Sequence, residues 1–241
     1  YLELLKDVGA DIIEQTGNHL VDWRRSALPE SLEMYHEAGM LTYGAGETLE
    51  SARQAVVVEH NGNRFAFLGC NPAGPEMVWA TDALPGAAPC DYEWMKNEIK
   101  RLRQEGILPI VTLQYFESYH YTPTPGEQRD FLPLAEAGAV IVSGSQAHYP
   151  QGMTFVGDAF IHFGLGNLFF DQMYMPVPGT EADAEVPGTR KEFIDRHVFY
   201  DGRYIGTELL TALLEDYSKP RPMTAEEREE MLRAAFDYSP W

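Results

Sequence analysis

Basic residues are scarce in this sequence. Only 18 lysines and arginines accompany 37 aspartates and glutamates, which gives a formal net charge of −19. A nucleic acid or an anionic lipid surface demands lysine and arginine to replace the counterions of its phosphates. We therefore expect no nucleic-acid partner, and a polyanionic ligand would need a local basic patch or bound cations.

Long hydrophobic runs are absent as well. No stretch of eighteen apolar residues occurs, so we expect no membrane span in this chain. The sequence begins at Tyr1, in what reads as the middle of a helix, and we expect that residues precede it. An export signal or membrane anchor could lie among them. With 241 residues, 44% of them hydrophobic, the chain can bury a sizeable core in one large domain.

Cysteine is nearly missing. Cys70 and Cys90 are the two present, and they flank a segment, residues 71–90, that is rich in proline, glycine and alanine and is expected to be a loop. In an oxidising compartment the two thiols could pair, and a pair of free thiols is at least as compatible with the sequence. Both alternatives are open at this stage.

Strand patterns alternate with helix patterns along the chain. Runs of β-branched residues predict strands at 11–15, 108–113 and 139–142, and helical spacing predicts helices at 92–104, 127–137 and 224–236. Glycine-containing turns predict hairpins around residues 61–63, 157–158 and 201–202. Thr224 is the expected N-cap of the last helix, with Glu227 completing a capping box. Such a mixture indicates an α/β sandwich with a mixed sheet.

Two polar segments each follow a short apolar strand. Residues 16–22 carry Asn18, His19 and Asp22, and residues 144–148 end in His148. Open α/β sheets keep their sites at the carboxyl edge of the strands. We therefore expect one site assembled from two distant segments. Because Asn, His and Asp are metal-ligand types, this site has the character of a remnant metal centre.

Five stretches follow one another in an order that resembles a known family: GADIIEQTGNHLVDW, YGAGETLESARQ, NGNRFAFLG, GAVIVSGSQAHYPQG and FIHFGLGNLFFDQ. The sequence resembles the CapA/PgsA capsule-synthesis proteins, which are linked to poly-γ-glutamate and look like calcineurin-type metallophosphoesterases. The resemblance covers roughly residues 1–172. It implies an α-β-β-α sandwich with mixed sheets, partly truncated at the N-terminus. The expected domain spans residues 1–214, followed by a C-terminal extension with a helix, residues 215–241.

The resemblance also implies a site. Asn18 would give its amide oxygen to a divalent Mn, Zn or Fe ion, with Asp22 as a further candidate ligand. His19 and His148 would act as catalytic acid or base, or contact a phosphate. The residues alone allow a simpler interpretation, in which Asn18 caps a turn and His19 merely packs.

Two segments depart from the family. Its His-Trp-Gly-x-Glu-Tyr segment is Gln114-Tyr115-Phe116-Glu117-Ser118-Tyr119 here, and its Gly-His-His-Pro-His is Gly144-Ser145-Gln146-Ala147-His148. Gln114, Ser145 and Gln146 thus stand where imidazoles would be. A neutral amide is a weak donor to a transition metal. In addition, the carboxylate of the family's opening Gly-Asp motif is not found in these residues. We therefore expect a metal site that is lost or rebuilt.

The cleft would nevertheless stay polar. We expect it to bind substrate through five side chains: Gln114, Glu117, Tyr119, Ser145 and Gln146. Aromatic rings beside polar groups suit sugar or peptide chains, although Phe116 is expected to pack over the sheet edge instead. Asn167 and Asp171 are candidates to orient the site from behind, and a turn carboxylate is the alternative for Asp171.

The resemblance implies a protein of synthesis, export or processing of an anionic capsule or cell-surface polymer such as poly-γ-glutamate. It would act on the polymer or on a small-molecule substrate as a metallophosphoesterase-like hydrolase. The alternatives are a non-catalytic module that binds polymer or cell wall, and an interaction protein with a vestigial cleft. Membrane-bound synthase partners and an extracytoplasmic, membrane-associated full-length protein are further expectations.

Overall fold

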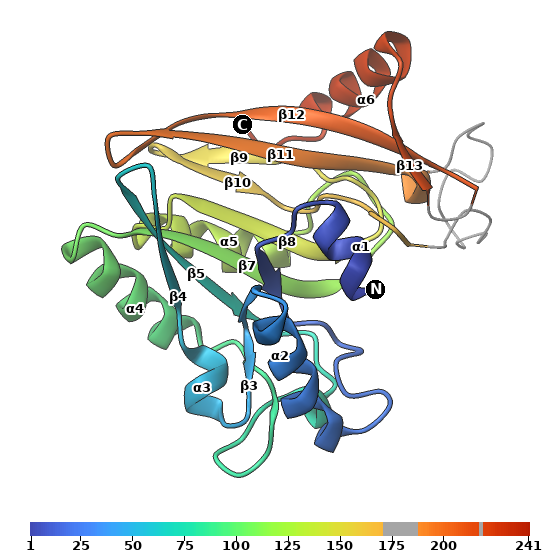
Figure 1. Cartoon of the computed structure of the whole chain (residues 1–241). Helices are drawn as coiled ribbons and strands as arrows, with labels where there is room; N and C mark the ends of the chain where they lie inside the picture. The colour runs from blue at the N-terminus through green and yellow to red at the C-terminus, as the bar shows by residue number, and fades with distance from the viewer. Residues whose placement is uncertain (171–187, 217–218) are drawn as a thin grey trace. The chain divides into compact units, whose positions relative to one another are not determined.

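The computed structural model describes residues 1–170, 188–216 and 219–241 (Figure 1). The chain divides into two compact units, residues 1–114 and 115–241. Strand β7 (Leu108–Ser118) begins in the first unit and ends in the second. The boundary expected between residues 214 and 215 stays a prediction.

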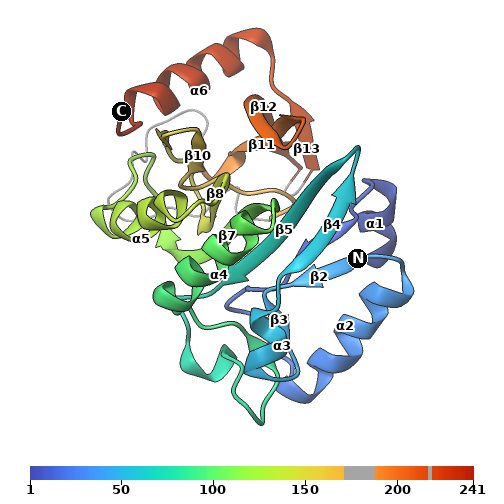
Figure 2. The ribbon, with the colours of Figure 1, turned by 90° about the vertical axis from the view of Figure 1, so that its left-hand side faces the viewer.

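The first unit contains short strands interleaved with helices. Its elements before β7 are α1 (Leu2–Asp7), β1 (Ile12–Glu14), the 3-10 turn η1 (Arg25–Ala27), α2 (Leu28–Glu37), β2 (Leu41–Tyr43), β3 (Ala45–Gly46), α3 (Leu49–Arg53), β4 (Val56–His60), β5 (Asn63–Cys70), η2 (Glu76–Val78), β6 (Gly86–Ala87) and α4 (Tyr92–Gln104). Strand β1 pairs in parallel with β2, and β5 pairs in parallel with β7 and antiparallel with β4. Helices α2 and α4 lie on opposite sides of these strands (Figure 2).

Local sequence explains the clearest elements of this unit. Helix α4 begins at its N-cap Asp91 and buries Met95, Ile99 and Leu102, which recur at helical spacing along one face. The turn between β4 and β5 has φ of 49° at Asn61 and 76° at Gly62, the left-handed geometry that a two-residue hairpin turn requires. Both the helix and the hairpin are confirmed.

A disulfide joins Cys70 to Cys90, across a sequence separation of 20 residues. This resolves the choice between paired and free thiols in favour of the pair. The segment between them contains η2 and β6, and β6 pairs antiparallel with β3. The disulfide therefore joins the two ends of the expected loop, and the pairing of β6 with β3 holds its middle.

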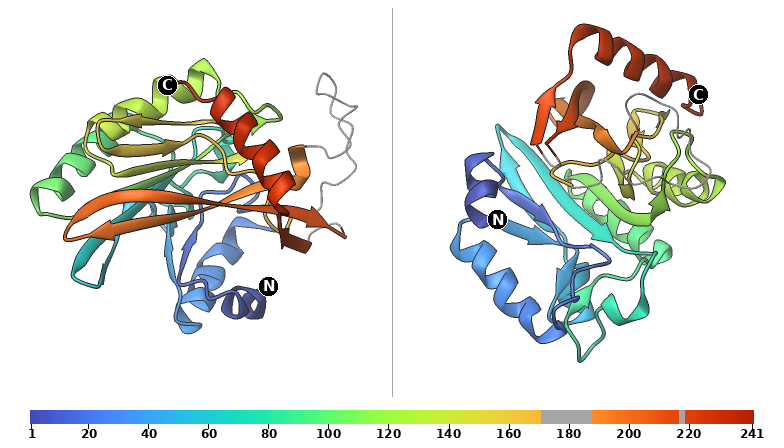
Figure 3. Two further views of the ribbon diagram at one scale, coloured as in Figure 1. Left: turned by 90° about the horizontal axis from the view of Figure 1, so that it is seen from above. Right: turned by 90° about the vertical axis from the view of Figure 1, so that its right-hand side faces the viewer.

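The second unit joins two β-layers to two long helices. After the end of β7 it contains α5 (Pro125–Glu136), β8 (Ile141–Ala147), β9 (Met153–Val156), β10 (Ala159–His162), η3 (Gly188–Arg190), β11 (Lys191–Tyr200), β12 (Arg203–Glu215), β13 (Lys219–Pro222) and α6 (Ala225–Asp237). Strand β10 pairs in parallel with β8 and antiparallel with β9, while β11, β12 and β13 form an antiparallel sheet (Figure 3). Thr224 caps α6 with Glu227 in a capping box, as expected.

One expectation for this unit is wrong. Ser145 and Gln146 were expected in a loop after residue 142, but β8 continues to Ala147. The apolar sequence pattern stops at residue 142, although the strand continues. At Gly144 an added Cβ would lie 1.9 Å from the backbone oxygen of Phe163, so a larger side chain does not fit there. Close backbone packing, rather than an apolar side chain, thus maintains the strand at this point.

Mixed parallel and antiparallel pairing with flanking helices confirms the predicted α/β class. Across the described residues, no helix has the length and apolar character needed to cross a membrane.

Candidate functional site

The loop that follows β1 starts from a fixed point, Thr16. This residue is 1% exposed, its carbonyl accepts a hydrogen bond from Asn71 Nδ2 at 2.8 Å, and its hydroxyl donates to Glu14. A Cβ added to Gly44 or Gly69 would lie 2.4 or 2.8 Å from its methyl group. The position of Thr16 is therefore set by close packing against two glycines and by hydrogen bonds with two side chains. No sequence pattern indicated this.

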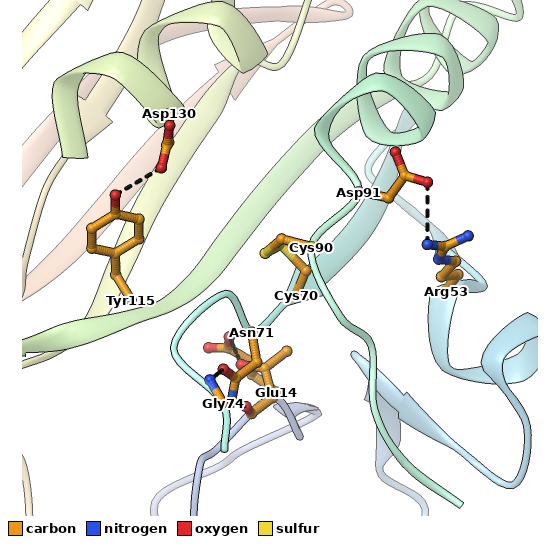
Figure 4. The surroundings of a disulfide bond; sticks show 10 residues. Glu14, Arg53, Cys70, Asn71, Gly74, Cys90, Asp91, Tyr115 and Asp130 are labelled. Atoms are coloured by element: carbon orange, nitrogen blue, oxygen red, sulfur yellow. Dashed lines mark hydrogen bonds and ion pairs between the residues drawn. A yellow bond between two sulfur atoms is a disulfide. The ribbon is translucent and has the colours of Figure 1, made fainter. Parts of the chain in front are cut away.

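Asn71 ties this loop to the disulfide. It is fully buried, directly follows Cys70, and its Oδ1 accepts from the Gly74 amide at 2.7 Å. Figure 4 shows Asn71 and Glu14 beside the Cys70–Cys90 bond. Burial raises the pKa of the Glu14 carboxyl, against hydrogen bonds from Thr16 and Thr112 that lower it.

The first unit brings four predicted site residues together in pairs. Gln114 Nε2 donates to Asn18 Oδ1 at 3.3 Å, and His19 Nδ1 lies 2.7 Å from Asp22 Oδ2. Gln114 is buried, whereas the His19 and Asp22 side chains are 78% and 60% exposed. The amide of Gln114 therefore contacts the very oxygen that was expected to face a metal, and His19 is an exposed imidazole paired with a carboxylate.

The second unit holds His148 between named partners. Its Nδ1 lies 2.8 Å from Asn167 Oδ1, and its Nε2 lies 3.4 Å from Glu117 Oε1. Asn167 Nδ2 donates to the Thr189 carbonyl at 2.9 Å, which turns the amide oxygen of Asn167 toward the imidazole. Asn167 thus holds the proton on Nδ1 of His148 and leaves Nε2 facing Glu117.

Tyr119 completes this group. Its ring stacks on His148 with centroids 5.0 Å apart, and its hydroxyl donates to Glu117 Oε1. The expected proximity of Glu117, Tyr119, His148 and Asn167 is therefore observed. We refer to these four residues as the His148 site.

The remaining predicted residues differ in their placement. Ser145 and Gln146 belong to strand β8, where Gln146 has a φ of 71° and each makes an interaction. Asp171 lies outside the described residues. Asn18, His19, Asp22 and Gln114 belong to the first unit, and the other candidates to the second.

A pocket of about 470 Å³ adjoins the His148 site within the second unit. Its walls include Phe116, Glu117, Tyr119 and Arg129. Phe116 was expected to pack over the sheet edge, but it is 53% exposed and lines this pocket. It makes an edge contact with the buried ring of Tyr115. The Tyr115 hydroxyl donates a hydrogen bond to Asp130 Oδ2 at 2.7 Å.

No sequence pattern indicated the buried polar residues in and behind the wall of the pocket. Gln151 is fully buried and donates to Ser118 Oγ at 3.2 Å and to Glu127 Oε2 at 3.5 Å. Burial raises the pKa of the Glu127 carboxyl, which also accepts from the Thr124 amide at 2.5 Å. The Ser118 carbonyl accepts from the His148 amide at 2.8 Å, so this network contacts the backbone of the His148 site. The one sequence feature that could have indicated this network is the capping-box pattern Thr124-x-x-Glu127 at the start of α5.

The described donor set does not fit the two-metal centre of the metallophosphoesterases. Across the residues that the structure describes, no three His, Cys, Asp or Glu side chains gather closely enough to hold a metal ion. The expected ligands Asn18 and Asp22 contact Gln114 and His19 respectively. We therefore derive no chemical step through a metal.

Comparison of the sequence with known proteins gives a consistent result. A family described as "Bacterial capsule synthesis protein PGA_cap" matches residues 1–172. The capsule biosynthesis protein CapA of Bacillus anthracis is 25% identical over 175 residues, covering 71% of this chain and 43% of that protein. The PGA biosynthesis protein CapA of Bacillus subtilis is 23% identical, covering 71% of this chain and 45% of the relative. A probable polyglutamine synthesis accessory protein of Mycobacterium tuberculosis is 24% identical, with 68% and 46% covered. The chain thus spans less than half the length of these relatives.

The fold agrees with a metallophosphoesterase-like architecture. A 5'-nucleotidase precursor from Thermus thermophilus superposes with a TM-score of 0.53 at 15% identity, covering 97% of this chain and 44% of that one. At this identity the similarity concerns the fold alone. The structural similarity therefore shows a metallophosphoesterase-like fold. The family match over residues 1–172 shows that the chain belongs to the bacterial capsule-synthesis (PGA_cap) family.

Proposed function

We propose that this chain belongs to an accessory protein for the synthesis, export or processing of an anionic cell-surface polymer such as poly-γ-glutamate, and that the polymer is processed at the His148 site. The observation that supports the proposal most is the fixed imidazole of His148, with Asn167 2.8 Å from one ring nitrogen and Glu117 3.4 Å from the other. Such an arrangement is typical of groups that transfer protons.

The reaction that suits these groups is hydrolysis of an amide bond. The Glu117 carboxylate would take a proton from the attacking water, and the His148 imidazolium would give one to the leaving nitrogen. A carbon–oxygen bond forms and the carbon–nitrogen bond breaks, with both protons accounted for. Tyr119, which donates to Glu117, and Asn167 would act as positioning residues. A catalytic role for His19 with Asp22 is a separate proposal for the first unit.

The experiment is incubation of purified protein with poly-γ-glutamate, with and without added Mn²⁺, and measurement of polymer length by size-exclusion chromatography. His148→Gln and Glu117→Gln should abolish the shortening. His36→Gln is the matched control, because His36 is an exposed histidine on α2 that contacts Thr42. Shortening that survives in His148→Gln would refute the assignment.

A second candidate function is a polymer-binding module without catalysis. It is favoured by the neutral side chains Gln114, Ser145 and Gln146, which keep hydrogen-bonding capacity where the family resemblance implies imidazoles. Binding of the polymer with no change in its length in any condition of the experiment above would favour this candidate.

Compartment and partners are part of the proposal. The Cys70–Cys90 disulfide supports an oxidising, extracytoplasmic location. The Mycobacterium tuberculosis relative is named a synthesis accessory protein, which supports association with a membrane-bound synthase. Co-purification of the full-length protein with the synthase subunits from membranes tests this association.

A further inference from the structure

The pocket beside the His148 site has walls suited to an uncharged ring rather than to a carboxylate. Its volume of about 470 Å³ falls within the range of pockets that enclose small ligands. All of its lining residues belong to the segment 115–129, so β7, α5 and the connection between them form it within one unit. What the pocket accepts depends on its charges and on its aromatic surface.

The charges at the pocket are offset by neighbours. The Arg129 guanidinium donates to both carboxylate oxygens of Asp130, at 2.8 and 3.0 Å. The Glu117 carboxylate faces His148 Nε2 at 3.4 Å. Burial raises the pKa of the Glu127 carboxyl and so favours its neutral form. A chain with a carboxylate on every residue, such as poly-γ-glutamate, would therefore meet a guanidinium that is already paired with a carboxylate.

The aromatic surface is the second feature. Phe116 is 53% exposed, although it is a large apolar side chain at the wall of a pocket. Its edge contact with Tyr115, at 5.1 Å and 90° between the rings, holds it against a buried neighbour. The electron-rich face of such a ring attracts the C–H groups of a sugar. Beside it, the exposed imidazole of His120 can bind a hydroxyl group.

We propose that this pocket is a carbohydrate subsite, which takes a neutral sugar ring of a glycan with Phe116 as the stacking platform and His120 as a hydrogen-bond partner for a hydroxyl group. The inference goes beyond the proposed processing of a polyanion. It gives the second unit a means of holding the protein on glycan while the His148 site works on another chain.

The test is calorimetric titration of the purified chain with an uncharged N-acetylglucosamine trimer, and separately with a γ-glutamyl oligomer. Phe116→Ala should weaken binding of the sugar trimer by about tenfold or more, which corresponds to about 1.4 kcal/mol. The matched control is Phe155→Ala on β9, because Phe155 is 51% exposed in the same unit and does not line the pocket. The control should change the affinity by less than about twofold, since a scattered exposed aromatic carries no binding energy for this ligand.

Three results would overturn the inference. The first is no saturable binding of the sugar trimer, and the second is an equal loss in Phe116→Ala and Phe155→Ala. The third is tighter, Phe116-dependent binding of the γ-glutamyl oligomer, which would assign the pocket to the polyanion instead. The proposed function is tested separately: His148→Gln should abolish polymer shortening and retain trimer binding. Shortening that persists in His148→Gln would refute the proposed function alone, and wild-type protein that shortens the polymer but does not bind the trimer would refute the subsite alone.

Discussion

Nδ1 of His148 lies 2.8 Å from Oδ1 of Asn167, and the amide nitrogen of Asn167 is held by the Thr189 carbonyl at 2.9 Å. The orientation of the amide is therefore set by the backbone, and the amide in turn sets the imidazole. This relationship fixes which ring nitrogen of His148 is free to meet Glu117, 3.4 Å away.

The first prediction concerns this tautomer. In Asn167→Leu the acceptor for the Nδ1 proton is lost, so neutral His148 should populate both tautomers instead of one. Nitrogen-15 NMR of histidine-labelled protein reports the protonated nitrogen directly. The ring signals of His197, which contacts Thr207 at 2.7 Å, serve as the internal control and should not move. An unchanged His148 spectrum would show that Asn167 does not set the tautomer.

The second prediction concerns pH and Glu192. This carboxyl is 1% exposed, neither of its oxygens has a hydrogen-bond partner in the described part of the chain, and burial raises its pKa to about 8. The folded protein thus holds a proton that the unfolded chain releases near its ordinary pKa. Stability associated with Glu192 is complete below that ordinary pKa and falls as the pH rises toward about 8.

Glu192→Gln removes this titration. Urea unfolding at pH 5 and pH 8.5 should show that the free energy of unfolding of the variant rises relative to that of the wild type as the pH rises, by up to about 4 kcal/mol. A matched change at the exposed Glu136→Gln should leave the pH dependence as it is in the wild type. Parallel pH profiles for wild type and Glu192→Gln would contradict the assignment.

The third prediction concerns the disulfide. Replacing both cysteines, Cys70→Ser with Cys90→Ser, releases a loop closed across 20 residues, and the free energy of unfolding should fall by about 3 kcal/mol. Dithiothreitol should destabilise the wild type by a similar amount and leave the double variant unaffected. Equal unfolding midpoints for wild type and double variant, without reductant, would mean that the bond does not stabilise the fold.

The fourth prediction concerns the contact between Thr16 and Gly69. The methyl added in Gly69→Ala would lie 2.8 Å from Thr16 Cγ2, so overpacking should cost about 1–3 kcal/mol. Thr16→Ser removes that methyl group and should recover part of the loss, because Thr112 and Tyr43 also lie within 3.2 Å of the new atom. A double-mutant cycle measures the recovery. Strictly additive effects would show that the two residues are not coupled.

The sequence predicted elements whose signals are local. Helix α4 and the turn at residues 61 and 62 follow from side-chain period, an N-cap and glycine, and they were found at the predicted places. Strand β8 was predicted too short, because its continuation depends on the approach of Gly144 to the Phe163 backbone. Such a contact between distant segments leaves no periodic trace in the sequence.

In the candidate site too, some features could be predicted from sequence motifs, whereas others depend on contacts that form only on folding. The family resemblance located His148, Glu117 and Asn167, and their proximity in the second unit follows from motifs at the ends of strands. The roles of Gln151 and Thr16 were not visible, since a buried amide and a buried threonine acquire their partners only on folding. The prediction that Phe116 packs over the sheet edge was wrong for a similar reason, because a ring at a strand end can face either the core or a pocket.

The most direct test of the account is whether the polymer reaches His148. Histidine-labelled protein should be titrated with a γ-glutamyl oligomer, following all imidazole signals by NMR. We predict that the His148 ring signals shift and saturate, while those of His197 and His36 stay in place. His148 signals that remain unchanged at saturating oligomer, or shifts confined to the other histidines, would contradict the central claim that the His148 site handles the polymer.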